Sequence, residues 1–330
     1  MGTDNPFPTP SSRRPKRVSK WADRAFAALT GTGATLLFAL LALFVIVLVI
    51  GAGPSIRQFG LHYLTNTVWI PASSNPNIPG NIYGIVPFAV GTLLTSALAL
   101  LIAIPLSLGA AIFLTQQAPR QLRRAVGQLI ELLAAIPSII YGFWGLIVLV
   151  PIMRYDIEPG LYSWLWWTGW FNSSPTGLDV LTASVVLAVM VIPTITAISR
   201  DSIAAVPIHQ KEAALSLGAT NWEVTRNAVL PYARGGVFAA VILGLGRALG
   251  ETMAVTLVIG NRNVVPNSLL SQGQTIASLL ANQFAESSGG LELSALFEAG
   301  LFLLLITLAI NVCARVVLAR FQRGGGAGKE

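Results

Sequence analysis

Charged residues are scarce in this chain: Asp, Glu, Lys and Arg make up 11% of its 330 residues, against about 25% in typical soluble domains. Hydrophobic residues, counted as Ala, Val, Ile, Leu, Met, Phe, Trp, Tyr and Cys, reach 54%. This composition excludes an intrinsically disordered chain, which is rich in charge and poor in hydrophobic residues. It also argues against a soluble enzyme, because so few charged side chains cannot cover the surface of a protein of this length.

Cysteine and histidine are almost absent as well. Cys313 is the single cysteine, and His62 and His209 are the two histidines. An intrachain disulfide is therefore excluded, and no Cys/His spacing indicates a metal site. The chain also lacks the HExxH and GxSxG motifs of zinc peptidases and serine hydrolases. We expect no catalytic residue, no metal ligand and no cofactor-binding residue on this chain, and hence no enzyme activity of its own.

The net charge of +7 at first suggests a nucleic-acid-binding protein, but the excess lies at the two ends of the chain. Residues 1–24 carry a net +4 and residues 315–330 a net +3, whereas residues 25–314 hold eleven basic and eleven acidic side chains. Basic clusters beside long apolar stretches are typical of membrane topology signals. We therefore expect no nucleic-acid partner and a protein embedded in the lipid bilayer.

Long apolar segments account for most of the chain. A transmembrane helix needs about 20 predominantly apolar residues, and six segments have this length. The sequence therefore predicts an all-α integral membrane protein with six transmembrane helices, over residues 31–51, 84–115, 128–152, 178–199, 233–260 and 294–318. The Pro- and Ser-rich start indicates a disordered basic cytoplasmic tail over residues 1–29, and residues 321–330 are expected to form a flexible cytoplasmic tail.

The charges between the predicted helices indicate how the protein is oriented. With the amino terminus in the cytoplasm, the inner loops carry a net +4 and the outer loops a net −2. This distribution follows the positive-inside rule. We therefore expect a multi-pass protein of the cytoplasmic (inner) cell membrane with both termini in the cytoplasm.

Tryptophan is concentrated in one short segment. Four of the eight tryptophans lie between Tyr162 and Phe171, in the second predicted outer loop. One interpretation is an aromatic belt at the outer membrane interface, where tryptophan is enriched. The other is a docking surface for a partner outside the cell membrane.

The inner loop over residues 200–232 reads as two short helices joined by a turn. Pro207 suits the first turn of a helix, and Gly218 is placed to end that helix, since glycine adopts the left-handed conformation of a helix C-terminus. Thr220 and Glu223 have the spacing of a capping box, which predicts the start of a second helix. Such a rigid elbow is suited to transmit force to a partner in the cytoplasm.

The spacing of residues in this loop resembles the EAA signature of the membrane subunits of ABC importers. Glu212-Ala213-Ala214 is followed after three residues by Gly218, and after nine more by Ala228-Val229-Leu230-Pro231. Where the family often has Ile, this chain has Ala228, a minor departure at an apolar position. The resemblance implies the type I ABC importer permease fold for residues 30–320. It also implies that Glu212, Ala213, Ala214 and Gly218 belong to a coupling helix that docks in a groove of a separate ATPase.

Two further segments are similar to the phosphate-specific permeases of this superfamily. One comprises Ala134-Ala135-Ile136-Pro137-Ser138 and Tyr141-Gly142-Phe143-Trp144-Gly145, in the third predicted span. The other is Gly246–Val255 in the fifth span, whose ending Glu-Thr-Met-Ala-Val resembles the PstC type rather than the PstA type. The resemblance covers residues 57–320 and narrows the implied substrate to phosphate.

The resemblance implies a function and a set of partners. The chain would be the permease subunit of an ATP-driven phosphate importer and form half of the translocation path. The implied partners are a PstA-like permease in a heterodimer, a PstB-like ATPase dimer bound through the EAA loop, and an extracytoplasmic phosphate-binding protein. ATP and Mg are expected on the partner ATPase, with no cofactor on this chain. Two alternatives stay open: an ABC permease for another oxyanion, molybdate or sulfate, or an ATP-independent secondary transporter or channel.

Arg247 and Glu251 are ionisable residues within the fifth predicted span, where a charge is costly. They are four positions apart, so on one continuous helix they can form an ion pair. One interpretation is structural: the pair neutralises itself and eases insertion. The other is that Arg247 binds the oxygens of phosphate through its planar guanidinium, while Glu251 holds Arg247 when the path is empty. The family resemblance favours the second interpretation.

Four other residues of the predicted spans are expected to have structural roles. Glu131 lies near the start of the third span and Glu298 near the outer end of the sixth. Gly246 and Gly250 are four positions apart, and this spacing of small residues predicts the close approach of a neighbouring helix.

Overall fold

The computed structural model of the chain describes residues 20–71, 80–287 and 289–324. Over these residues the protein is helical, with two isolated β-bridges and no β-strand. The chain divides into two units, Met1–Val47 and Leu48–Glu330, and the second unit contains every candidate site residue.

The helical elements follow one another with short connections. In chain order they are α1 (Lys20–Phe59), α2 (His62–Thr65), α3 (Val86–Ile112), η1 (Phe113–Gln117), α4 (Arg120–Ala134), α5 (Ser138–Trp144), η2 (Gly145–Leu149), α6 (Val150–Ile152), η3 (Met153–Ile157), α7 (Glu158–Leu165), η4 (Trp166–Thr168), α8 (Val180–Ala204), α9 (Ile208–Ser216), α10 (Asn221–Val224), η5 (Thr225–Val229), α11 (Leu230–Leu249), α12 (Met253–Thr256), α13 (Ile276–Gln283) and α14 (Gly290–Gly324). Several elements run directly into the next, so that α5 to η4 and α10 to α11 each form one long helical segment.

Six helical segments in the described part of the chain are long and apolar enough to cross a membrane, which confirms the predicted number. They are Asp23–Phe59, Val86–Gln117, Ser138–Thr168, Val180–Ala204, Asn221–Leu249 and Gly290–Arg320. The second, fourth and sixth lie close to their predicted bounds, whereas the third and fifth differ.

The third span begins later than the predicted 128–152. Arg120–Ala134 forms the separate helix α4, and the chain turns at Pro137 before α5 begins. The reason is local, because a proline disfavours the helical conformation in the residue that precedes it. Glu131 therefore lies on α4, where its carboxylate is 2.9 Å from the guanidinium of Arg200 on α8. This ion pair between two helices supports the structural role expected for Glu131.

The predicted tails are shorter than expected where the structure describes them. Residues 20–29 begin α1, and residues 321–324 end α14. At the amino-terminal side the correction has a simple cause, since the alanine-rich stretch 22–28 favours helix. The remaining residues of the two predicted tails, 1–19 and 325–330, lie outside the described residues.

Helix α8 lies at the centre of the second unit and is the most buried of the six spans. Ala99 and Ala103 of α3 share one buried apolar cluster with Met190 of α8. On the α11 side, a β-carbon added at Gly244 would lie 2.7 Å from Cδ1 of Ile195. Small residues at these positions let the helix backbones approach closely, which is how helices associate within a membrane.

Glu298 joins α14 to the last turns of α1. The hydroxyl of Ser55 donates a hydrogen bond to the Glu298 carboxylate, and the Ser55 N–H donates to Oγ of Ser294 at 2.9 Å. The Ser294 hydroxyl in turn donates to the carbonyl of Gly51 at 2.8 Å. These contacts satisfy a carboxylate at membrane depth and support the structural role expected for Glu298.

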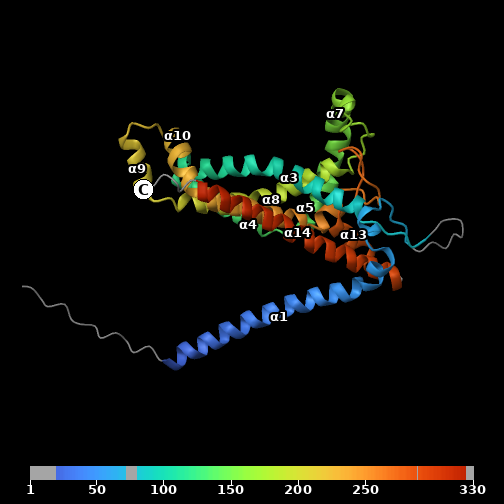
Figure 1. Cartoon of the computed structure of the whole chain (residues 1–330). Helices are drawn as coiled ribbons and strands as arrows, with labels where there is room; N and C mark the ends of the chain where they lie inside the picture. Colours follow the sequence, from blue (N-terminus) through green and yellow to red (C-terminus); the bar gives the residue numbers. More distant parts are fainter. Residues whose placement is uncertain (1–19, 72–79, 288, 325–330) are drawn as a thin grey trace, which may run out of the picture. The chain divides into compact units, whose positions relative to one another are not determined.

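The two ends of the helix bundle formed by the described residues of the second unit carry different elements. Helices α9 and α10 lie at one end, and α7 and α13 lie at the other (Figure 1). The Trp-rich segment belongs to the α7–α13 end, where Trp164 and Trp167 are 81% and 73% exposed.

Candidate functional site

The α9–α10 elbow has the local structure that the sequence predicts. Helix α9 is followed by Gly218, whose φ of 82° is the left-handed conformation, and the Gly218 N–H donates to the Leu215 carbonyl at 2.9 Å. The Thr220 N–H donates to the Glu223 carboxylate at 2.8 Å, and the Glu223 N–H donates to the Thr220 hydroxyl at 3.4 Å. This capping box starts α10, so both helix ends are stabilised by residues of the elbow itself. Pro207 directly precedes α9 rather than lying in its first turn.

One face of α9 packs against the bundle, and the other is exposed. Ala214 packs against a buried apolar cluster that includes Val224 and Val229. Glu212 and Ala213 are exposed, and the elbow has further exposed apolar side chains. These are Ile208, Leu215, Leu217 and Trp222, of which Leu217 is 88% exposed. An exposed apolar patch of this kind marks a surface that contacts another molecule.

The elbow also contacts the end of the second span. The ammonium group of Lys211 on α9 lies 3.3 Å from the side-chain carbonyl of Gln116 in η1. Arg123 of α4 donates to the carbonyls of Leu114 and Thr115 in the same π-helical turn, at 2.7 and 3.0 Å. The elbow is therefore in contact with the helix end at which α3, η1 and α4 meet.

Arg247 lies in the last turn of α11 and is half-buried. Its Nη1 donates a hydrogen bond to the hydroxyl of Thr194 on α8 at 3.2 Å. None of the ion pairs formed between described residues includes Arg247. The guanidinium is thus held by a neutral group, and its positive charge has no carboxylate partner in the described part of the chain.

The predicted ion pair between Arg247 and Glu251 is wrong for the residues that the structure describes. Helix α11 ends at Leu249, earlier than in the predicted span 233–260, so the two residues do not share one continuous helix. The Glu251 carboxylate instead accepts a hydrogen bond from the Ala254 N–H at 3.1 Å, at the start of α12. Two effects explain the break: the glycine after Leu249 disfavours helix, and unpaired N–H groups at a helix start attract a carboxylate.

The two segments that resemble phosphate-specific permeases meet beside Arg247. Gly142 of α5 approaches α12 so closely that an added β-carbon would lie 2.8 Å from Cα of Ala254. The neighbouring Tyr141 donates its hydroxyl to the Leu133 carbonyl at 2.8 Å and lies within electrostatic range of Arg247. Segments more than a hundred positions apart in the chain therefore pack against each other next to the helix end that carries Arg247.

The face of α11 next to Arg247 is open. A β-carbon added at Gly246 would meet no atom within 4 Å, and one at Gly250 would meet only the Gly246 carbonyl, at 3.6 Å. Leu243 and Met253 on either side are 56% and 49% exposed. Within the described part of this chain, no helix packs on the two glycines, so the close approach of a neighbouring helix stays a prediction.

The site combines one fixed cation with neutral hydrogen-bonding groups. Arg247 and the Thr194 hydroxyl can donate charge-assisted hydrogen bonds to an anion, whereas the Tyr141 hydroxyl already donates to the Leu133 carbonyl. The described residues contain no group of three or more His, Cys, Asp or Glu side chains that could hold a metal ion. Sequence reasoning missed Thr194, because a lone threonine within an apolar helix carries no signal, whereas Tyr141 belongs to one of the segments that resemble the permeases.

Solved structures of similar fold are membrane subunits of ABC transporters. One is the MetNI methionine ABC transporter in inward-facing conformations, with a TM-score of 0.52 and 17% identity, covering 70% of this chain and 92% of that one. Another is a bacterial ABC transporter involved in the import of the acidic polysaccharide alginate, with a TM-score of 0.50 and 17% identity, covering 90% and 99%. At this identity the likeness shows the fold alone, and it confirms the predicted ABC importer permease fold.

Relatives with known names share far more of the sequence. The chain is 47% identical over 305 residues to the phosphate transport system permease protein PstC of Pasteurella multocida, covering 91% of this chain and 93% of that protein. It is 45% identical over 310 residues to the PstC protein of Haemophilus influenzae, covering 93% and 96%. These relatives are named as transport permeases, not as enzymes.

Residues 103–324 also match the family described as binding-protein-dependent transport system inner membrane component. This match spans the elbow, Arg247 and both segments beside it. Together with the identity to the PstC proteins over nearly the whole chain, it identifies the protein as a multi-pass membrane permease. The chain belongs to the binding-protein-dependent transport permeases, within their PstC-type branch.

Proposed function

We propose that this chain is the permease subunit of an ATP-driven phosphate importer and forms half of its translocation path. The observation that carries the proposal is Arg247, a guanidinium bonded to a neutral hydroxyl beside an open helix face, in a chain whose relatives are named phosphate transport permeases. Arginine suits this role, because it stays protonated and its planar fork matches the oxygens of phosphate. A charge at membrane depth is costly unless it faces a cavity or a partner.

A PstA-like permease completes the path in this proposal. The open face of α11, with Gly246, Gly250 and the exposed Leu243, is the surface on which the second permease packs. Small residues there allow close approach between two membrane helices. Arg247 then lies at the border between the two permeases, where phosphate can reach it.

Glu251 acts as a positioning residue beside the path. Its hydrogen bond to the Ala254 N–H holds the turn that follows α11 and so fixes the helix end that carries Arg247. Because its carboxylate does not neutralise Arg247 in the described residues, the guanidinium is available to an incoming anion. A negative charge close by keeps the bound anion from becoming trapped, as a conducting path requires.

The α9–α10 elbow couples the path to ATP hydrolysis. We infer that the exposed residues Glu212, Ala213 and Gly218 dock on a PstB-like ATPase dimer, which binds ATP and Mg, while Ala214 packs α9 against the bundle. Closure of that dimer moves α9, and the contact between Lys211 and Gln116 passes the movement to the second span. The permease pair then opens outward, and hydrolysis returns it to the inward-open state.

The orientation follows from the same argument. The α9–α10 end lies in the cytoplasm with both chain termini, and the α7–α13 end faces outward from the inner cell membrane, in agreement with the positive-inside distribution of charge. An extracytoplasmic phosphate-binding protein delivers its cargo at the α7–α13 end. The exposed tryptophans there serve either as an aromatic belt or as part of that docking surface.

Uptake by the reconstituted transporter tests the proposal. The two permeases, the ATPase and the binding protein are assembled in proteoliposomes, and labelled phosphate is followed with and without ATP. The proposal predicts accumulation that requires ATP and the binding protein and is not reduced by excess sulfate or molybdate. Competition by those anions would assign another oxyanion as cargo, and accumulation without the ATPase would make the chain a secondary transporter or channel.

A further inference from the structure

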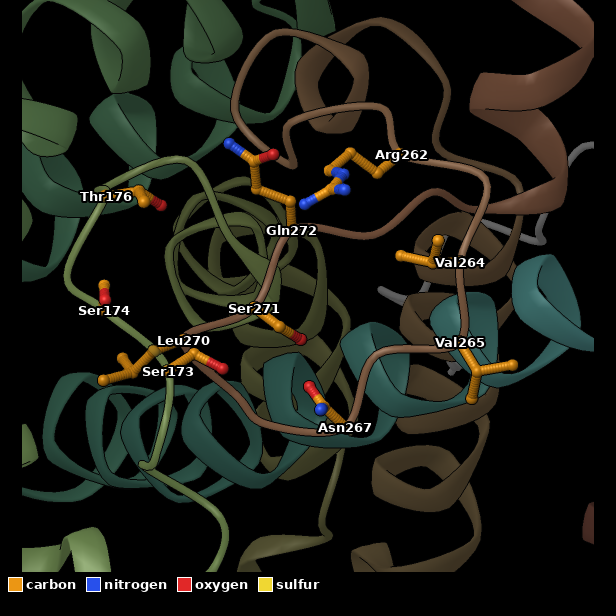
Figure 2. A pocket seen from close by; sticks show the side chains of 10 residues that line it. All are labelled: Ser173, Ser174, Thr176, Arg262, Val264, Val265, Asn267, Leu270, Ser271 and Gln272. Atoms are coloured by element: carbon orange, nitrogen blue, oxygen red, sulfur yellow. The ribbon is translucent and has the colours of Figure 1, made fainter.

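A polar pocket whose lining does not include Arg247 lies at the α7–α13 end of the protein. It has a volume of about 440 Å³ and is formed by two segments far apart in the chain, the one before α8 and the one between α12 and α13 (Figure 2). The lining includes the hydroxyls of Ser173, Ser174 and Thr176 from the first segment. The second segment contributes Arg262 and the amide of Gln272.

Hydrogen bonds between the two segments fix the walls of this pocket. The Trp170 carbonyl accepts from the Leu269 N–H at 2.8 Å and from the Ser268 hydroxyl at 2.9 Å. The Val180 N–H, at the start of α8, donates to the Ser271 carbonyl at 3.1 Å. Because these bonds join the pocket to a central helix of the bundle, the pocket is part of the folded core of this end and does not depend on a ligand for its shape.

The backbone around Arg262 is also held in a specific conformation. Gly260 and Asn261 have φ values of 89° and 52°, and the Arg262 N–H donates to the Gly273 carbonyl at 3.1 Å. Figure 2 shows the Arg262 side chain directed in toward the other lining residues. No hydrogen bond or ion pair of its guanidinium with another described residue is present. The pocket therefore contains a cation whose donors are free to bind an incoming group.

Two buried acidic groups contact the segment before α8 but do not belong to the pocket lining. Glu158 and Asp179 are both fully buried, and the Glu158 carboxylate accepts from the Gly177 N–H at 3.0 Å. Burial, and to a lesser extent the hydrogen bond and the negative charge of Glu158, raise the pKa of Asp179 well above its ordinary value. The lining itself contains one positive side chain and no carboxylate. Its remaining polar groups are neutral hydroxyls and amides, which can donate hydrogen bonds to an anion.

We propose that this pocket is an anion site on the outward side of the permease, where a tetrahedral oxyanion such as inorganic phosphate binds before it reaches Arg247. The guanidinium of Arg262 binds two oxygens through its fork, and hydroxyls such as those of Ser173 and Ser174 donate to the others. A cation at the mouth of the path also raises the local concentration of a divalent anion. The sequence assigns Arg262 no role beyond its count in an outer loop. This inference rests on the orientation and the cargo of the proposed function.

Protection of an introduced cysteine tests the site directly. In the complete transporter in right-side-out vesicles, Cys313→Ser removes the native thiol of this chain and Ser174→Cys introduces one in the lining. A negatively charged thiol reagent is then added outside, with inorganic phosphate or with chloride at equal ionic strength. We expect phosphate, and not chloride, to slow modification of this chain. Arg262→Gln should raise the half-protecting phosphate concentration roughly tenfold, as loss of a charge-assisted hydrogen bond predicts.

The control variant is Arg154→Gln, at an exposed arginine of the same end whose guanidinium lies 5.4 Å from the Tyr155 ring and outside the pocket lining. It should keep the protection by phosphate. If phosphate and chloride protect the introduced cysteine equally, the effect is ionic screening and the inference is overturned. The inference is also overturned if Arg262→Gln leaves the half-protecting phosphate concentration unchanged. ATP-driven uptake in the same vesicles separates the two proposals. If the vesicles take up phosphate but phosphate does not protect the introduced cysteine, only the inference about the pocket is rejected. If phosphate protects the cysteine but is not taken up, only the proposed function is rejected.

Discussion

The hydrogen bonds that shape the α9–α10 elbow join near neighbours in the chain: Thr220 and Glu223 are three positions apart. The bond from Lys211 to Gln116 connects this elbow to a distant segment. At the α7–α13 end, hydrogen bonds join distant segments, and Ser268 and Trp170 are 98 positions apart. Because its bonds are local, the elbow can keep its shape when its position changes. The structure of the α7–α13 end depends on contacts between distant segments, so it persists only while the helices of the bundle stay packed. We infer from this comparison that the elbow can move as one unit, whereas the α7–α13 end keeps its shape through contacts between distant segments.

The largest expected effect comes from placing a charge on the exposed surface of the elbow. Leu217→Asp should reduce co-purification of the ATPase roughly thirtyfold, because a charge within an apolar contact costs about 2 kcal/mol of binding free energy. Thermal unfolding of the permease should be unchanged, since Leu217 is 88% exposed. The matched variant is Trp164→Asp, at a side chain 81% exposed at the other end, which should retain the ATPase. Loss of the ATPase in both variants would remove the distinction between the two ends.

Two glycines with similar left-handed backbone conformations, one at each end, allow the same substitution to be tested at both ends. Gly218 and Gly169 have φ values of 82° and 78°, and an added β-carbon at either would meet no atom within 4 Å. Alanine at either position therefore costs about 1 kcal/mol of conformational free energy and creates no clash. We expect Gly218→Ala to lower phosphate transported per ATP hydrolysed roughly fivefold, and Gly169→Ala to leave that ratio unchanged. The opposite ranking would place the moving element at the α7–α13 end.

The buried acid at the α7–α13 end predicts a dependence of stability on pH. The raised pKa of Asp179 means that the folded state binds a proton more tightly than the unfolded state. Its contribution to stability is therefore complete below the ordinary pKa of aspartate and is lost as the pH rises through the raised value. Asp179→Asn should flatten the fall in Tm with rising pH by about 2–4 °C. The control Asp156→Asn, at an exposed residue, should keep the slope, and an unchanged slope in Asp179→Asn would show that this carboxyl is ionised in the fold.

The smallest effect is expected at the capping box of the elbow. Thr220→Ala removes an exposed cap and should lower the free energy of unfolding by about 1 kcal/mol or less, since water replaces the lost hydrogen bond. The second capping box of the described chain, Thr275 with Ser278 at the start of α13, is buried. Thr275→Ala should cost about 2 kcal/mol, because it leaves a buried N–H without a partner. Thermal unfolding of the two variants side by side measures the difference, and equal losses would contradict it.

Features encoded by near neighbours could be predicted from the sequence. The turn at Gly218, the capping box of Thr220 and the six apolar spans all depend on residue types within one short window, and the structure confirms them. The permease family was also evident, because the loop that contains Glu212 has a fixed spacing. The break at Pro137 carried a local signal too, since the proline interrupts the predicted third span.

Features that depend on distant contacts could not be predicted in this way. The bond from Arg247 to Thr194 joins two helices whose relative rotation the sequence does not specify. Nothing in the sequence places Glu158 and Asp179 side by side, and only the fold shows that both are buried and interact. The expected pairing of Arg247 with Glu251 was wrong, because it assumed that apolar composition alone extends a helix past Gly250.

The central claim is that the guanidinium of Arg247 binds phosphate on the transport path. The most direct test compares ATP-driven uptake of labelled phosphate by Arg247→Gln, Arg247→Lys and the control Arg234→Gln, whose arginine is exposed on the same helix. Each variant is first matched for assembly with the ATPase. The account predicts that uptake is lost in Arg247→Gln, is partly retained in Arg247→Lys, which keeps the charge without the planar fork, and is normal in Arg234→Gln. Normal uptake by a fully assembled Arg247→Gln transporter would contradict it.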